Sequence, residues 1–197
     1  MSSSASLHDT PIGRLTWLWL FVGFALLPFT IVQTMLPLAA WLAPVFLLRF
    51  ARTARRPWVA LSLIFLVQAI SNTIANRGGD LENIYVVVIS LSTFTVFRGL
   101  ASTVPYAADR LIGSRLDERT RTFVFPLALT TIDWLMTFLP AVNSTESTVY
   151  SQYDSLSLMQ IGSITGMWGI AFLIGGAPRP STLFGIGAST GGLCAAW

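Results

Sequence analysis

The stretch RLTWLWLFVGFALLPFTIVQTMLPLAAWLAPVFLLRF, residues 14–50, decides the fold class of this chain. Its only charged residues are Arg14 and Arg49. One helix of this length would overshoot the hydrocarbon core of a bilayer, because about 20 residues, each rising about 1.5 Å, are enough to cross it. We therefore predict two short membrane spans, near 14–29 and 32–49, with a turn between them.

The composition favours the same class of protein. Of the 197 residues 53% are hydrophobic and only 11% are charged, whereas a soluble domain carries about a quarter charged residues. A chain so poor in charge would expose large apolar patches in water. We therefore predict an all-α fold, a polytopic membrane helix bundle whose immediate partner is the phospholipid bilayer.

Four further apolar segments follow, separated by polar connections, which gives about six transmembrane helices in all. We predict a polar N-terminal tail over 1–13, a transmembrane helical domain over 14–175 and a low-complexity tail over 176–197 that is rich in glycine, alanine and serine. The remaining spans are predicted near 58–75, 84–104, 122–139 and 158–175.

The arginines predict the orientation of these spans. Positively charged residues gather in cytoplasmic connections. The connections that follow the second and fourth spans are rich in arginine, the one after the third has only Arg77, and the one after the fifth has none. We predict a cytoplasmic N-terminus in a bacterial cytoplasmic (inner) membrane. The arginines of the two rich connections are Arg49, Arg52, Arg55, Arg56, Arg110, Arg115, Arg119 and Arg121.

Several kinds of chemistry are absent from the sequence. The chain has no lysine, its one histidine is His8, and its one cysteine, Cys194, has no histidine nearby in sequence. No cluster has metal-ligand spacing and no phosphate loop is present, so we predict no metal, no cofactor and no catalytic residue. The basic residues lie beside apolar spans, a pattern of topology signals, so we predict no nucleic-acid partner.

Two charged residues, Arg98 and Asp133, lie inside predicted spans. Such residues are costly in hydrocarbon and are candidates for a functional site. We hypothesise that they pair, because both lie at moderate depth from the cytoplasmic side. The alternative is that the Arg98 side chain reaches the interface and Asp133 faces a polar cavity alone.

The sixth predicted span contains Gly162, Gly166 and Gly169 at helical spacing. Small residues at this spacing let two helices approach closely. We predict that they form a packing face against a neighbouring helix of the bundle, and the alternative is a dimer interface.

The segment YSQYDSLSLMQIGSITGMWGIAFLI, residues 150–174, resembles the segment before the catalytic domain of apolipoprotein N-acyltransferases and their nitrilase-type membrane relatives. FPLALTTIDWLMTF, PYAADRLIGSRL and PLAAWLAPVFLLRFAR resemble earlier parts of the same family's membrane domain. The resemblance implies acyl transfer from a phospholipid donor to a lipoprotein acceptor in the intact family. It also implies that Tyr150, Gln152 and Tyr153 lie near an outward portal.

The chain differs from the family in the residues of one membrane helix and in the catalytic residues. Asp133 replaces the usual glutamate, and Met136 and Thr137 replace an arginine-glycine pair. The family's Glu-Lys-Cys triad belongs to a nitrilase domain after a seventh helix, and this chain has no lysine. We therefore expect this chain to be a truncated fragment that corresponds to the membrane part of such an enzyme and is inactive in acyl transfer by itself.

Two other interpretations remain open. In the first, a separate nitrilase-domain protein docks on this membrane part to complete the enzyme. In the second, the chain is a small six-span transporter or membrane scaffold in which Arg98 and Asp133 form a polar site. Solute flux that is lost on Asp133→Asn would favour the transporter.

Overall fold

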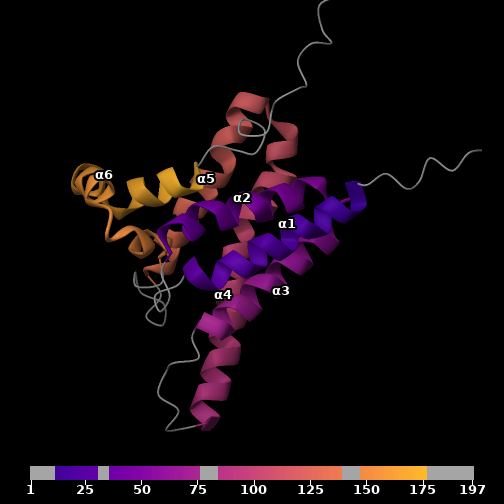
Figure 1. The fold of residues 1–197 in the computed structure, drawn as a ribbon, viewed down its shortest axis with the longest axis horizontal. Coiled ribbons are helices and arrows are strands. Elements are labelled where there is room, and N and C mark those ends of the chain that lie inside the picture. Colours follow the sequence, from indigo (N-terminus) through magenta and orange to yellow (C-terminus); the bar gives the residue numbers. More distant parts are fainter. Residues whose placement is uncertain (1–11, 31–35, 76–83, 139–146, 177–197) are drawn as a thin grey trace, which may run out of the picture.

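The computed structural model describes residues 12–30, 36–75, 84–138 and 147–176. These ranges form an all-helical fold, which confirms the all-α part of the prediction (Figure 1). The elements of the described part are six α-helices and three short 3-10 helices. The α-helices are α1 (Ile12–Leu26), α2 (Pro37–Thr53), α3 (Pro57–Ala75), α4 (Ile84–Leu111), α5 (Glu118–Met136) and α6 (Leu156–Gly175), and the 3-10 helices are η1 (Leu27–Thr30), η2 (Gly113–Arg115) and η3 (Thr148–Gln152).

The helices pack mainly on their neighbours in sequence: α1 on α2, α3 on α4, α4 on α5 and α5 on α6 (Figure 1). Helix α2 also contacts α3, α4 and α6, which places it at the centre of the packing. One stripe of α2 is buried because Ala39, Ala43, Leu47 and Phe50 recur at a spacing of three or four residues. Leu47 joins Ile64 of α3 in the main apolar cluster.

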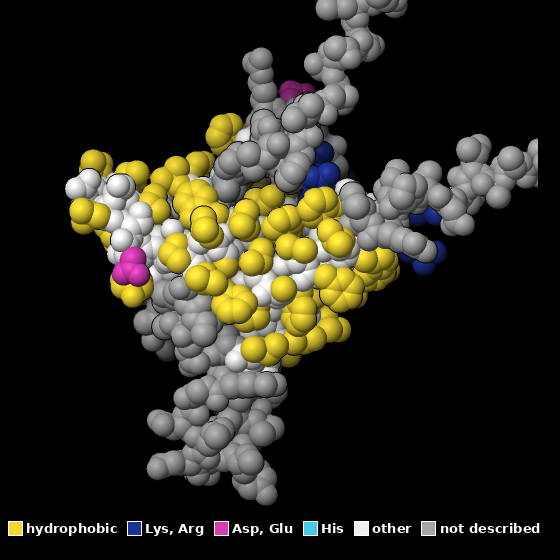
Figure 2. Space-filling view, viewed as in Figure 1, with side chains coloured by type: hydrophobic (Ala, Val, Ile, Leu, Met, Phe, Trp, Pro, Cys, Tyr) yellow, Lys and Arg dark blue, Asp and Glu magenta, His cyan; other side chains and the backbone are white. Residues whose placement is uncertain are grey.

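Large apolar side chains also cover the outside of the bundle. Figure 2 shows a broad apolar face, and Phe21, Leu38 and Trp58 are among the exposed residues. Two helices of the described part are long and apolar enough to cross a membrane, α3 over Pro57–Ile74 and α6. An exposed apolar surface of this extent fits contact with lipid better than contact with water.

Helix α4 continues past the predicted end of its span at 104, through Pro105 to Leu111. We expected the proline to end the span, because proline inside a helix removes a backbone hydrogen bond and costs about 3 kcal/mol. Packing offsets this cost here: Pro105 is buried, and the ring of Tyr106 lies 5.1 Å from that of Phe125 on α5. Much of the predicted arginine-bearing connection is therefore helical.

Helix α6 is kinked. Gly166 has φ 69° and ψ −179°, a backbone conformation that separates two helical pieces within Leu156–Gly175. Glycine tolerates a positive φ because it has no Cβ. The piece after the kink is partly buried through Ile170 and Ile174, while Ile164 before it is 88% exposed.

Several sequence predictions lie outside the described residues. These are most of the N-terminal tail, the first turn, the polar connection after the third span and nearly all of the C-terminal tail with Cys194. The corresponding ranges are 1–11, 31–35, 76–83 and 177–197.

Candidate functional site

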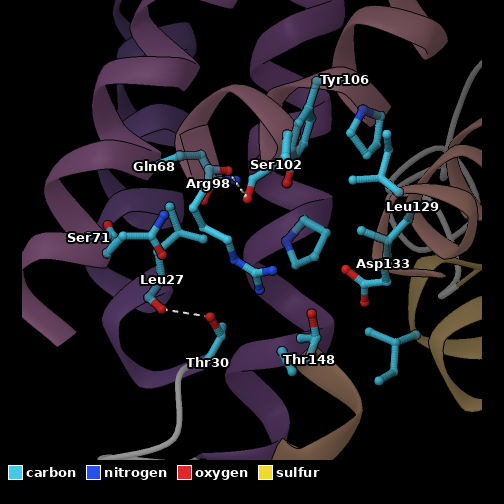
Figure 3. A pocket seen from close by; sticks show the side chains of 17 residues that line it. Leu27, Thr30, Gln68, Ser71, Arg98, Ser102, Tyr106, Leu129, Asp133 and Thr148 are labelled. Atoms are coloured by element: carbon cyan, nitrogen blue, oxygen red, sulfur yellow. Dashed lines mark hydrogen bonds between the residues drawn. The ribbon is translucent and has the colours of Figure 1, made fainter. Parts of the chain in front are cut away.

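A partly open cavity of about 80 Å³, lined by both polar and apolar residues, lies between the helices of the bundle (Figure 3). Helices α2, α3, α4 and α5 supply most of its wall, so the site depends on the packing of the whole bundle. Its most polar lining residues are Thr30, Gln68, Ser71, Asn72, Arg98, Ser102, Tyr106, Asp133 and Thr148.

Arg98 of α4 and Asp133 of α5 both line this cavity, and Figure 3 shows their charged groups extending into it. The Asp133 carboxylate is largely buried, at 8% exposure, and accepts a hydrogen bond of 3.1 Å from the hydroxyl of Ser147. The structure thus brings the two residues to one site, and their direct ion pair stays a prediction.

Helix α3 contributes polar residues that sequence reasoning missed. Gln68, Ser71 and Asn72 are buried and line the cavity. Ser71 is 1% exposed, and its hydroxyl has no hydrogen-bond partner among the described residues. The signal was present in the sequence, because positions i, i+3 and i+4 of an apolar helix lie on one face.

Two prolines, and the residues four positions before them, lie at the same cavity. Proline has no N–H, so it cannot donate to the carbonyl four residues earlier in its helix. Pro44 leaves the Ala40 carbonyl without this donor in α2, and Pro105 does the same for Ala101 in α4. All four residues line the cavity. Prolines are tolerated in membrane helices where other groups satisfy the released carbonyl.

The predicted portal residues lie in and beside η3. Gln152 is 2% exposed, accepts a hydrogen bond from Trp41 Nε1 at 3.1 Å and donates to the Pro37 carbonyl at 3.0 Å. These contacts hold η3 against the start of α2. Tyr150 and Tyr153 are exposed, and their role as a portal stays a prediction.

The three glycines of α6 lie around its kink. A Cβ added at Gly162 would meet Ile170 Cδ1 at 2.8 Å, and one added at Gly169 would meet the Thr165 side chain. A Cβ at Gly166 would meet nothing within 4 Å. The nearest side chains therefore belong to α6 itself, and packing against another helix or a second copy stays a prediction.

A network of charges joins three helices at one end of the bundle. Asp109 of α4 accepts two hydrogen bonds from Arg52 of α2, at 2.7 and 2.5 Å, and Arg121 Nη2 of α5 lies 3.9 Å from the same carboxylate. Arg110 donates to three carbonyls at the end of α2, those of Ala51, Arg52 and Ala54. The two arginine-rich segments of the sequence therefore meet.

No group of three or more metal-ligating side chains occurs among the residues that the structure describes. No family model matches the chain, and neither a curated protein nor a solved structure matches it.

Proposed function

We propose that this chain is a multi-pass membrane domain whose six helical segments cross a bacterial cytoplasmic membrane, with the N-terminus in the cytoplasm. The observation that carries the proposal is the separation of charge along α2. Its C-terminal end meets Asp109 and the arginine-rich segments, whereas its N-terminal end meets Gln152. The helix between them, Pro37–Thr53, is roughly 25 Å long, close to the hydrocarbon thickness of about 30 Å.

Cysteine labelling tests this orientation. Cys194→Ser gives a cysteine-free background, and Ser114 and Asp154 are exposed at the two proposed ends. We expect a membrane-impermeant maleimide to label Asp154→Cys in intact spheroplasts and to label Ser114→Cys only after the membrane is opened. Labelling of both from outside, or the reverse pattern, would contradict the proposed topology.

We further propose that this domain plays the part that the membrane half plays in apolipoprotein N-acyltransferases, as an anchor that gives access to phospholipid. The support is the resemblance of residues 14–174 to that family. The sequence contains no lysine, so a Glu-Lys-Cys triad cannot form within it. A nitrilase domain outside these 197 residues would then supply the catalytic residues, either on a longer form of the chain or on a separate protein.

The purified 197-residue chain is therefore expected to transfer no acyl group. The assay supplies a phospholipid donor and a lipoprotein with a free N-terminal cysteine, and mass spectrometry detects the added acyl chain. An intact N-acyltransferase in the same micelles is the positive control. Acylation by this chain alone would overturn the assignment.

The cavity favours a second candidate, a small membrane protein that binds or transports a polar solute. Ionisable residues within a bundle commonly mark the path or binding site of a substrate. Here Arg98 and Asp133 from two helices meet buried polar groups of a third at one cavity.

A further inference from the structure

We propose that the cavity binds a small zwitterion, a molecule that carries one carboxylate and one ammonium group, between Arg98 and Asp133. The proposal deepens the second candidate function and rests on it. Arg98 and Asp133 supply one charge of each sign to one cavity. A lone anion or cation would add net charge to a site away from water, which is costly. A zwitterion leaves the total charge unchanged and offers each protein group a partner of opposite sign.

Arg98 is suited to the carboxylate end of the ligand. A guanidinium presents several N–H donors in a plane, and its hydrogen bonds to carboxylates are charge-assisted. Ser71 adds a hydroxyl that is buried and has no hydrogen-bond partner in the described part of the chain. A buried hydroxyl of this kind gains free energy when a ligand atom satisfies it.

The ammonium end has acceptors of its own. The Asp133 carboxylate, held by Ser147, supplies the negative charge. Ala40 and Ala101, whose carbonyls each lack a helical donor because a proline follows four residues later, are among the residues that line the same cavity. An ammonium group has three donors and no acceptor, so a carboxylate with two carbonyls matches its needs.

The cavity limits the ligand's size. Its 80 Å³ is about half of a cavity of about 150 Å³ that holds benzene in another protein, and several times the roughly 10–15 Å³ that one water molecule needs. Only a ligand of few heavy atoms fits this volume, and the smallest α-amino acid is the one without a side chain. We therefore choose glycine as the probe.

The test is thermal unfolding of the full chain in detergent micelles with increasing glycine. Acetate and methylammonium each carry one half of the probe, and leucine carries both charges on a larger body. We expect glycine to raise the unfolding temperature in a saturable way, because a ligand of the native state stabilises it. Acetate, methylammonium and leucine at equal concentration should have no effect.

Variants locate the binding. Arg98→Gln and Asp133→Asn should each weaken glycine binding about tenfold or more, since each removes a charge-assisted hydrogen bond. Ser71→Ala changes one hydroxyl and should weaken binding about three- to tenfold without preventing folding. Ser114→Ala, an exposed serine outside the cavity, is the matched control and should bind glycine as the wild type does.

Three results would overturn the proposal: no shift with glycine, an equal shift with acetate, or a glycine shift that Ser71→Ala and Asp133→Asn leave unchanged. The assay measures equilibrium binding and needs no transport. A failure here removes the ligand class, whereas solute flux in liposomes that is lost on Asp133→Asn would still support the transporter.

Discussion

Replacing Asp109 with alanine is expected to lower the free energy of unfolding by about 2–3 kcal/mol, because the guanidinium of Arg52, whose side chain is 23% exposed, would lose its buried partner. The Asp109 side chain is 0% exposed, and its carboxylate accepts two hydrogen bonds from Arg52 in a bidentate pair. Arg121 lies near the same carboxylate. The alanine variant therefore leaves two arginines facing one another where α2, α4 and α5 meet. Denaturant titration in micelles, followed by tryptophan fluorescence, measures the change.

Asp117 provides the matched control. It is exposed before α5, and its side chain makes no capping hydrogen bond. Asp117→Ala should change stability by no more than about 0.5 kcal/mol, as surface substitutions commonly do. If Asp109→Ala and Asp117→Ala unfold at the same denaturant concentration, the network does not hold the three helices together.

The importance of Asp109 was not predictable from the sequence, although the helical class was. Long apolar segments with few charges require helices whatever their neighbours are. Asp109, by contrast, follows Pro105 in a segment that reads as a connection. It enters the interior because α4 continues through the proline, and that continuation depends on the packing of Tyr106 against Phe125. Contacts between distant segments carry no local signal in one sequence.

The residues of the candidate site were partly predictable from the sequence, whereas their arrangement around one cavity was not. Arg98 and Asp133 were predictable because a charge within an apolar segment is unusual in any arrangement of helices. The helical spacing of Gln68, Ser71 and Asn72 was also visible. Their meeting with Pro44 and Pro105 at one cavity depends on the rotation of each helix about its axis. That rotation is set by packing between helices, which periodicity alone does not give.

A double-mutant cycle on Arg98 and Asp133 is expected to reveal a coupled pair. Arg98→Ala and Asp133→Ala should each cost about 3 kcal/mol, because each leaves an opposite charge at the cavity without its counterpart. The loss in the free energy of unfolding of the double variant should be about 1–2 kcal/mol smaller than the sum of the two single losses, since the second substitution removes the charge that the first one left without a counterpart. Unfolding in micelles supplies all three values.

The control cycle pairs Arg98→Ala with Asp154→Ala. Asp154 is exposed beside η3 and does not line the cavity, so its effect should add to that of Arg98→Ala within about 0.5 kcal/mol. If the effects were additive in both cycles, Arg98 and Asp133 would line one cavity without being energetically coupled. Arg98 would then be stabilised by other contacts, as the interpretation in which its side chain reaches the interface requires. A coupling confined to the Asp133 cycle would instead show that the two charges act as one site.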